Sequence, residues 1–157
     1  VPQAADVGVA QFRPLYSQRS EVRLDGARAD KRLAHWHGVV VSACEQCGRA
    51  VVPEVAMPLP LVPVLAALSA GGLRLILDPD AGVSLSQLTL DTTQPVCLAV
   101  GPEGGWSPQD LEQLHAAGFS GVRLGPRVLR TETAGLAAIS ALQVLHGDLC
   151  EGRALAR

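Results

Sequence analysis

Apolar residues along this 157-residue chain occur in two patterns, as short continuous runs and as helical repeats. Between residues 33 and 43 they recur at intervals of three and four, which predicts a long amphipathic helix. Short runs rich in Leu, Val and Ile are typical of buried strands. The patterns predict strands over 12–16, 51–55, 73–77, 96–100 and 122–124, helices over 27–47, 60–69, 108–117 and 133–146, the tail of a helix over 1–6, and a loop over 80–93.

Short apolar strands that alternate with helices are typical of an α/β fold. Such strands are apolar on both sides, so both faces of the sheet must be covered, as they are in parallel sheets. The chain is long enough for one domain with a core of its own. The pattern therefore predicts a parallel sheet with helices on both faces.

A glycine-rich loop follows the strand candidate 96–100 and leads directly into a helix. Residues 101–105 read Gly-Pro-Glu-Gly-Gly, and Ser107 is a helix N-cap candidate with a proline after it and an acidic residue three positions later. In open α/β sheets, ligands bind beyond the carboxyl ends of the strands. This loop offers backbone N–H groups and the Glu103 carboxylate at that edge.

A second loop of the same kind, residues 125–130, lies between the strand candidate 122–124 and a long apolar helix. Either loop alone could be a simple glycine turn. Together they indicate a pocket in which glycine lets the backbone approach a nucleotide-like cofactor closely. The chain has no G-x-G-x-x-G fingerprint, which disfavours a dinucleotide site of the Rossmann type.

The two loops together resemble the signature of one protein family. GPEGGWS at 101–107 and LGPRVLRTETA at 124–134 are similar to the motifs of the bacterial small-subunit rRNA uracil-N3 methyltransferases (RsmE type), of the knotted SPOUT class of S-adenosylmethionine enzymes. The resemblance covers nearly the whole chain, with Asp6-Val7 in place of the family's Glu-Leu. Further matching positions are Asp6 to Val9, Pro14-Leu15, Arg19-Ser20, Glu45-Gln46, Gly48-Arg49 and Pro53.

This resemblance implies a fold and an assembly. Residues 1–157 would form one SPOUT methyltransferase catalytic domain, an α/β parallel sheet with a C-terminal trefoil knot, although general rules of chain connection argue against knots. The family carries a small PUA-like β-barrel RNA-binding domain upstream, and we expect that domain to be missing from this chain. SPOUT enzymes place the cofactor site at a two-fold interface, so a homodimer is expected.

The resemblance also implies an activity. The expected enzyme transfers a methyl group from S-adenosyl-L-methionine to N3 of a specific uridine in 16S rRNA of the small ribosomal subunit. Uracil N3 carries a proton, so some group must accept it or stabilise the anion that remains. Glu103 and Glu132 are the candidate bases, and Arg130 could stabilise the anionic uracil. The sequence leaves open which group accepts the proton.

The cofactor is expected to lie between the same two loops. Leu124, Val128 and Leu129 would offer its adenine ring an apolar wall. The expected cofactor-binding residues are Leu77, Gly101, Pro102, Glu103, Gly104, Gly105, Leu124, Gly125, Val128, Leu129 and Thr133.

Charge limits what this domain can do with RNA alone. The chain has 13 Lys and Arg residues against 15 Asp and Glu, a formal net charge of −2, whereas free-standing RNA-binding domains are usually basic. The basic residues gather between positions 13 and 32 and around the second loop. Arg19, Arg49 and Arg127 are the candidate RNA contacts, because arginine suits bidentate phosphate binding. Weak RNA binding by the isolated domain is expected.

Cysteine content and hydropathy bear on location and metals. Four cysteines are too few for a disulfide scaffold, and the CxxC of Cys44 and Cys47 has no second pair nearby, which disfavours a zinc or redox site. No signal peptide is visible at the start, and no apolar run reaches about 18 residues. A cytoplasmic protein without a metal site is expected.

Two alternative functions remain open. One is a SPOUT methyltransferase that acts on another RNA atom, such as a ribose 2′-hydroxyl. The other is a non-catalytic RNA-binding module with the same fold. Two intact cofactor loops disfavour the second alternative, because a module that only binds RNA has no reason to keep them.

Overall fold

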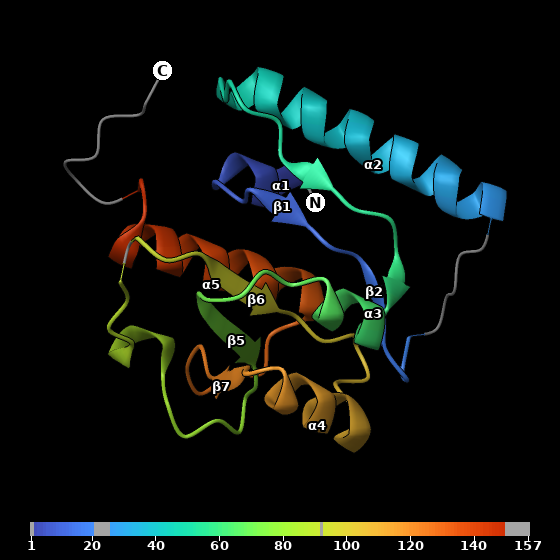
Figure 1. Ribbon diagram of the computed structural model, residues 1–157. Helices are drawn as coiled ribbons and strands as arrows, with labels where there is room; N and C mark the ends of the chain where they lie inside the picture. Colours follow the sequence, from blue (N-terminus) through green and yellow to red (C-terminus); the bar gives the residue numbers. More distant parts are fainter. Residues whose placement is uncertain (1, 21–25, 92, 150–157) are drawn as a thin grey trace.

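The computed structural model describes residues 2–20, 26–91 and 93–149. Helices surround short parallel strands, as Figure 1 shows. The helices are α1 (Pro2–Asp6), α2 (Gly26–Cys47), α3 (Leu61–Ala66), α4 (Pro108–Ala116) and α5 (Thr131–His146), with a 3₁₀ turn η1 (Leu85–Gln87). The strands are β1 (Gln11–Phe12), β2 (Leu15–Tyr16), β3 (Glu54–Val55), β4 (Leu59–Pro60), β5 (Leu73–Leu77), β6 (Val96–Ala99) and β7 (Ser120–Val122).

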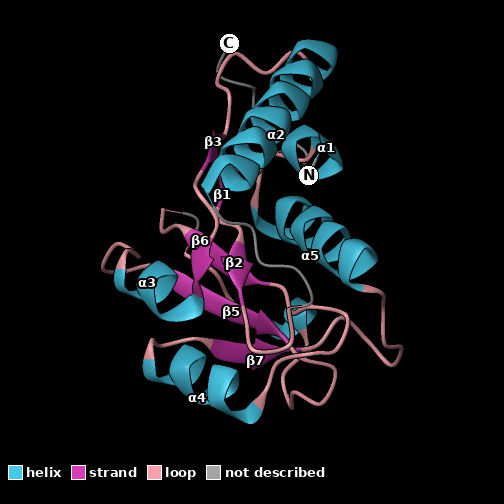
Figure 2. Cartoon of the chain, turned by 90° about the vertical axis from the view of Figure 1, so that its right-hand side faces the viewer, coloured by secondary structure: helices cyan, strands magenta, loops and turns pink. Residues whose placement is uncertain are grey.

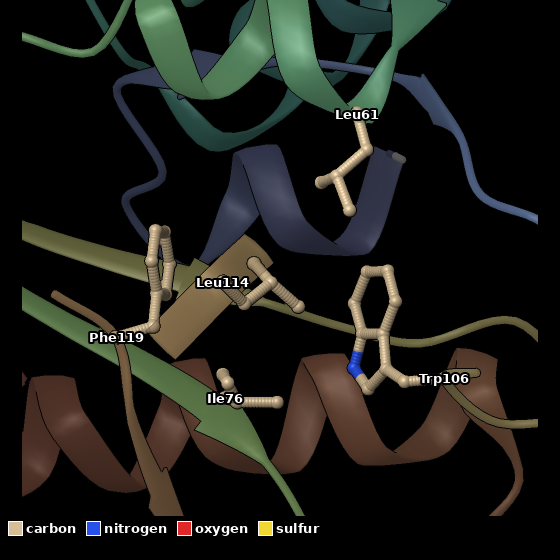
Figure 3. Packing of buried hydrophobic residues seen from close by; sticks show 5 residues of the cluster. All are labelled: Leu61, Ile76, Trp106, Leu114 and Phe119. Carbon is tan, nitrogen blue, oxygen red and sulfur yellow. The ribbon is translucent and has the colours of Figure 1, made fainter. Parts of the chain in front are cut away.

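The main sheet consists of three parallel strands in the order β6-β5-β7. Successive side chains of the central strand β5 point to opposite faces, so they enter two different cores. Ile76 packs with Leu61 of α3 and Leu114 of α4 (Figure 3). Leu75 packs on the other face with Leu85 of η1 and with side chains of α5. The predicted parallel sheet with helices on both faces is confirmed.

The N-terminal part of the chain forms a smaller layer of its own. β1 pairs with β3 and β2 pairs with β4, both in parallel. α1 packs on α2 around a third core in which Ala5, Val40 and Cys44 are buried. Figure 2 shows α1 and α2 together at the top, with α3 and α4 beside the main sheet below. The long helix predicted over 27–47 is therefore present as α2.

The strand predicted over 12–16 is divided into β1 and β2. Arg13 and Pro14 separate the two pieces, and each piece pairs with a different partner strand. Proline lacks the N–H that a continuous ladder needs, which explains the break.

The last strand lies two residues earlier than the predicted strand 122–124. After Val122 the chain leaves β5, because the Arg123 N–H donates to Val83 O at 2.9 Å and Arg123 O accepts from the Leu85 N–H at 3.0 Å. Residue 123 thus pairs with the segment before η1, which lies inside the region predicted to be a loop.

α5 begins two residues before the predicted start and is highly apolar. Of its 16 residues only Ala138 is buried, while Val144 and Leu145 are 55% and 45% exposed. Most of its apolar side chains therefore remain partly open to solvent. Over the described ranges, no helix has the length and apolar character needed to cross a membrane.

Candidate functional site

A cavity of about 760 Å³ lies at the carboxyl ends of the three main strands. Ligands bind at this edge in open α/β sheets. The volume is within the range of roughly 300–1,000 Å³ that is usual for small-ligand sites. Its lining consists of residues 77–80, 100–103, 105, 106, 111, 122–125, 127–132 and 134.

Local contacts hold the first loop. The Gly105 N–H donates to Pro102 O at 2.8 Å and closes a turn, with Gly105 at φ +68°, a conformation that favours glycine. Trp106 follows and is only 9% exposed, with its indole in the core that Figure 3 shows. A Cβ on Gly101 would stand 3.1 Å from Trp106 Nε1. Gly101 therefore makes room for the indole.

The predicted N-cap of the following helix is confirmed. The Asp110 N–H donates to Ser107 Oγ at 3.0 Å, and the Ser107 N–H donates back to Asp110 Oδ2 at 3.1 Å. The two residues are 4% and 3% exposed. This reciprocal capping box fixes the direction in which the loop enters α4.

The first loop presents different residues on its two sides. Glu103 and Gly105 line the cavity, whereas Gly104 does not. Gly104 O instead accepts a hydrogen bond from Arg19 Nη1 at 2.7 Å. The predicted cofactor residue Gly104 and the predicted RNA contact Arg19 thus meet each other outside the cavity.

The second loop is more exposed than the first. Gly125 has φ +134°, which residues with side chains rarely adopt, and Val128 is 79% exposed. At the end of the loop, Arg130 O accepts the Thr133 N–H at 2.9 Å in the first turn of α5. The loop therefore passes along the cavity and is fixed where it joins the helix.

Most of the predicted site residues share this one cavity. The three catalytic candidates line it from three places: Glu103 in the first loop, Arg130 in the second loop and Glu132 in the first turn of α5. Thr133 is exposed and is not part of the lining, because successive side chains on a helix point roughly 100° apart. The predicted cofactor residues found in the lining are Leu77, Gly101, Pro102, Glu103, Gly105, Leu124, Gly125, Val128 and Leu129.

The three predicted RNA contacts lie in three different places. Arg127 lines the cavity. Arg49 is half-buried, and its Nη1 donates to Ala5 O at 2.7 Å and to Val9 O at 2.8 Å, so it ties α1 to the end of α2. Arg19 lies against the first loop. The contacts of Arg49 favour a structural role for that residue.

Sequence reasoning missed an acidic segment of the lining. Asp78 and Asp80 follow β5, and the Asp80 N–H donates to Asp78 Oδ1 at 3.0 Å. Arg123 holds the same segment by donating from Nη1 to Ala81 O at 2.8 Å and to Gly82 O at 3.1 Å. The Asp-Pro-Asp sequence directly after a strand was a usable signal, because strand ends are where ligand sites form.

The three cysteines that the structure describes are not part of the cavity lining. Cys44 is buried, Cys47 is exposed, and Cys97 is half-buried in β6. Burial raises the pKa of the Cys97 thiol, although Arg74 and Arg13 act in the opposite direction. Within the part of the chain that the structure describes, no group of three or more His, Cys, Asp or Glu side chains could hold a metal ion.

The cavity combines an apolar wall with charges of both signs. Leu77, Leu124 and Leu129 supply apolar surface for a flat ring. Carboxylates suit hydroxyl groups and a positive centre, and guanidinium groups suit an anion. The charged side chains of the lining are those of Asp78, Asp80, Glu103, Arg123, Arg127, Arg130 and Glu132.

A comparison with known protein families shows to which family this chain belongs. The family described as the RNA methyltransferase domain matches residues 1–143, which include both loops and all of the cavity lining. The chain belongs to this RNA methyltransferase family. The domain is 34% identical over 149 residues to the ribosomal RNA small subunit methyltransferase E of Buchnera aphidicola subsp. Schizaphis graminum, covering 95% of this chain and 60% of that protein.

Other relatives of this methyltransferase domain carry the same name. The protein of the same name from Mycobacterium tuberculosis is 38% identical over 146 residues, covering 90% of this chain and 56% of the relative. The crystal structure of a ribosomal RNA small subunit methyltransferase E from Neisseria gonorrhoeae, bound to S-adenosyl methionine, matches with a TM-score of 0.87 and 43% identity, covering 95% of this chain and 61% of that one. The domain thus spans about three fifths of the length of these relatives.

Proposed function

We propose that this domain is the catalytic part of an S-adenosylmethionine-dependent methyltransferase that acts on N3 of a specific uridine in 16S rRNA. The observation that supports this proposal is the single cavity at the strand ends, lined by both glycine-rich loops. The Neisseria relative is bound to S-adenosyl methionine in its crystal structure. An rRNA substrate in the small subunit implies a cytoplasmic site of action.

The cavity fits this cofactor. Leu77, Leu124 and Leu129 can contact the adenine. Apart from its neighbours in the sequence, no described residue has a heavy atom within 4 Å of the Cβ position of Gly125, so that side of the loop is open. The carboxylates of Asp78 and Glu103 would face the positively charged sulfonium and the ribose hydroxyls of the cofactor. When bound, the cofactor supplies an electrophilic methyl group.

The protein's own residues would prepare the uracil for methylation. The proton on N3 must leave as the new bond to carbon forms, and the carboxylate of Glu103 or Glu132, both of which line the cavity, would accept it. The Arg130 guanidinium would stabilise the negative charge on the uracil oxygens. Arg127, on the same loop, is our candidate for a phosphate of the RNA.

RNA binding beyond the cavity requires more basic surface. Arg28, Lys31, Arg32 and His35 are exposed at helical spacing on the first half of α2, so they share one face. We propose that this face, with Arg127, contacts the rRNA backbone. A PUA-like RNA-binding domain, expected in the whole protein, would supply the rest of the affinity. The shallow salt dependence expected from so few contacts can be measured on the isolated domain.

We also propose a homodimer and a trefoil knot of the SPOUT class. Partly exposed apolar residues along α5 support a two-fold interface there. α5 also begins in the lining of the cavity, so an interface on this helix would lie close to the cofactor. A symmetric interface above about 1,000 Å² is expected, and light scattering at tens of micromolar would test it. Threading of α5 can be tested by stretching the chain from its ends, because a tightened knot shortens its final length.

Mass spectrometry of rRNA nucleosides tests the proposed reaction. Small subunits from cells that lack the gene should gain 3-methyluridine when incubated with the full-length protein and cofactor. A 2′-O-methylated nucleoside instead would favour the alternative target. If no methylated product forms although the cofactor binds, the domain is a binding module and the proposed function is wrong.

A further inference from the structure

A short turn, residues 17–20, lies against the back of the first loop. Ser17 closes this turn, since the Ser20 N–H donates to Ser17 O at 3.2 Å and the Ser17 N–H donates to Ser20 Oγ at 3.0 Å. Ser17 is 3% exposed, whereas Gln18 and Arg19 are exposed, so the turn is anchored in the protein at Ser17. The turn directs Gln18 and Arg19 toward the segment 104–110.

Arg19 fixes one peptide group of the first loop. Its Nη1 donates to Gly104 O at 2.7 Å, and its Cβ and Cδ lie 3.6 Å from the Cβ position of Gly104. The N–H of that same peptide belongs to Gly105 and donates to Pro102 O at 2.8 Å. A rotation of this peptide would break both hydrogen bonds together, so Arg19 holds the turn in one conformation.

A buried carboxylate anchors the turn that carries Arg19. The Gln18 N–H lies 3.3 and 3.4 Å from the two carboxylate oxygens of Asp110, which is 3% exposed. The Gln18 side chain also donates to Gln109 Oε1. Asp110, the capping-box partner of the N-cap Ser107, thus connects α4, the end of the first loop and the turn 17–20.

We propose that Arg19 is a positioning residue for the cofactor, which acts through the first loop rather than by touching RNA. Glu103 and Gly105 line the cavity, whereas Gly104, which accepts the Arg19 hydrogen bond, does not. Arg19 Nη1 also lies 4.0 Å from the Cβ position of Gly105, so it contacts the loop directly beside the lining. Arg19 itself is not part of the cavity lining. This inference rests on the cofactor assignment made under Proposed function.

The test measures cofactor and RNA binding separately, in the full-length protein. Arg19→Ala should raise the Kd for S-adenosylmethionine by about tenfold in calorimetry, because the loop must then be ordered on binding. Arg19→Lys should recover part of the loss, since one ammonium N–H can still reach Gly104 O. The Kd for a small-subunit RNA fragment should change less than about twofold. Arg28→Ala on α2 is the matched control. It should weaken binding of the RNA fragment and leave the Kd for S-adenosylmethionine unchanged.

A second measurement is independent of any ligand. Exchange of the Gly105 amide hydrogen should be faster in Arg19→Ala than in the parent protein, while amides of α4 keep their rates. The melting temperature without ligand should stay within about 2 °C.

If Arg19→Ala and the parent protein have the same Kd for S-adenosylmethionine, the positioning role is wrong. If only the Kd for the RNA fragment rises, Arg19 is an RNA contact. If the parent protein binds no cofactor, the proposed function fails instead. If Arg19→Ala has a much lower melting temperature than the parent protein, Arg19→Lys replaces it in the comparison with the parent. Weakened cofactor binding by Arg19→Lys with no change in the exchange rate of the Gly105 amide would then overturn the inference.

Discussion

The two loops at the cavity are held in different ways. In the first, Trp106 is buried, the Gly105 N–H closes a turn onto Pro102, and Arg19 binds Gly104 from outside. In the second, Val128 is 79% exposed, and no backbone hydrogen bond joins residues 125–129 to another described residue. The first loop is therefore preorganised by the chain itself, whereas the second is fixed mainly at its ends.

This difference implies a division of roles. A preorganised loop loses little conformational freedom when a ligand binds, but an exposed loop must be ordered by what it contacts. Substitution of the buried Trp106 that follows the first loop should mainly change stability, and substitution of the exposed side chains of the second loop should mainly change binding and rate. Four substitutions test this division.

The largest effect is expected at Trp106. Trp106→Ala should lower the free energy of unfolding by about 3–5 kcal/mol, because it opens a large hole beside Leu61 and Ile76. Trp106→Phe is the control, since Nε1 has no hydrogen-bond partner within the described part of the chain. It should cost less than about 1.5 kcal/mol in denaturant unfolding. An equal loss in both variants would show that a phenyl ring cannot replace the indole in this core.

Gly125 is the position in the second loop where a substitution should lower stability. At φ +134° a side chain is strained, so Gly125→Ala should cost about 1–3 kcal/mol in thermal unfolding. Gly104→Ala is the matched control, because Gly104 has no positive φ and its Cβ would make ordinary contact with Arg19 at 3.6 Å. That change should cost below about 1 kcal/mol. Equal costs would exclude backbone conformation as the cause.

Arg130 should separate chemistry from stability. Arg130→Ala should lower the single-turnover rate of methyl transfer at least about tenfold, or roughly 1.4 kcal/mol of transition-state stabilisation. Arg130 is exposed, so the free energy of unfolding should change by less than about 0.5 kcal/mol. Cofactor affinity should stay within a few-fold. A near-normal rate would remove Arg130 from the catalytic residues.

The smallest effect on stability is expected at Val128. Because the side chain is 79% exposed, Val128→Ser should change the free energy of unfolding by less than about 0.5 kcal/mol. If the loop closes over the adenine, the Kd for the cofactor should still rise severalfold. Leu129→Ser, at a half-buried position, is the control that should lower both stability and affinity. Unchanged cofactor affinity in Val128→Ser would show that this loop stays open.

The strand, turn and helix around each loop could be read from the sequence. Ser107 and Asp110 bond across three residues, and Gly105 bonds to Pro102 across the same distance. Such contacts depend only on neighbouring residues, so local residue types determine them. Apolar periodicity likewise predicted α2 and α5 and the central strand β5.

The ends of strands and the roles of side chains were harder to predict where segments distant in the sequence form the contacts. β7 ends at Val122 because residue 123 pairs with Val83 and Leu85, and the apolar run at 122–124 carries no sign of that partner. Thr133 and Gly104 belong to the right motifs but lie outside the cavity lining, since motif membership does not determine which way a residue faces.

The sequence by itself determined the fold class, the two loops and the family to which they belong. Only the tertiary structure placed Arg19 against Gly104, 85 residues away, and Arg49 against Ala5, 44 residues away. An arginine side chain can serve a phosphate or a backbone carbonyl equally well. Which of the two it meets depends on how separate segments pack, and that packing is a property of the whole chain.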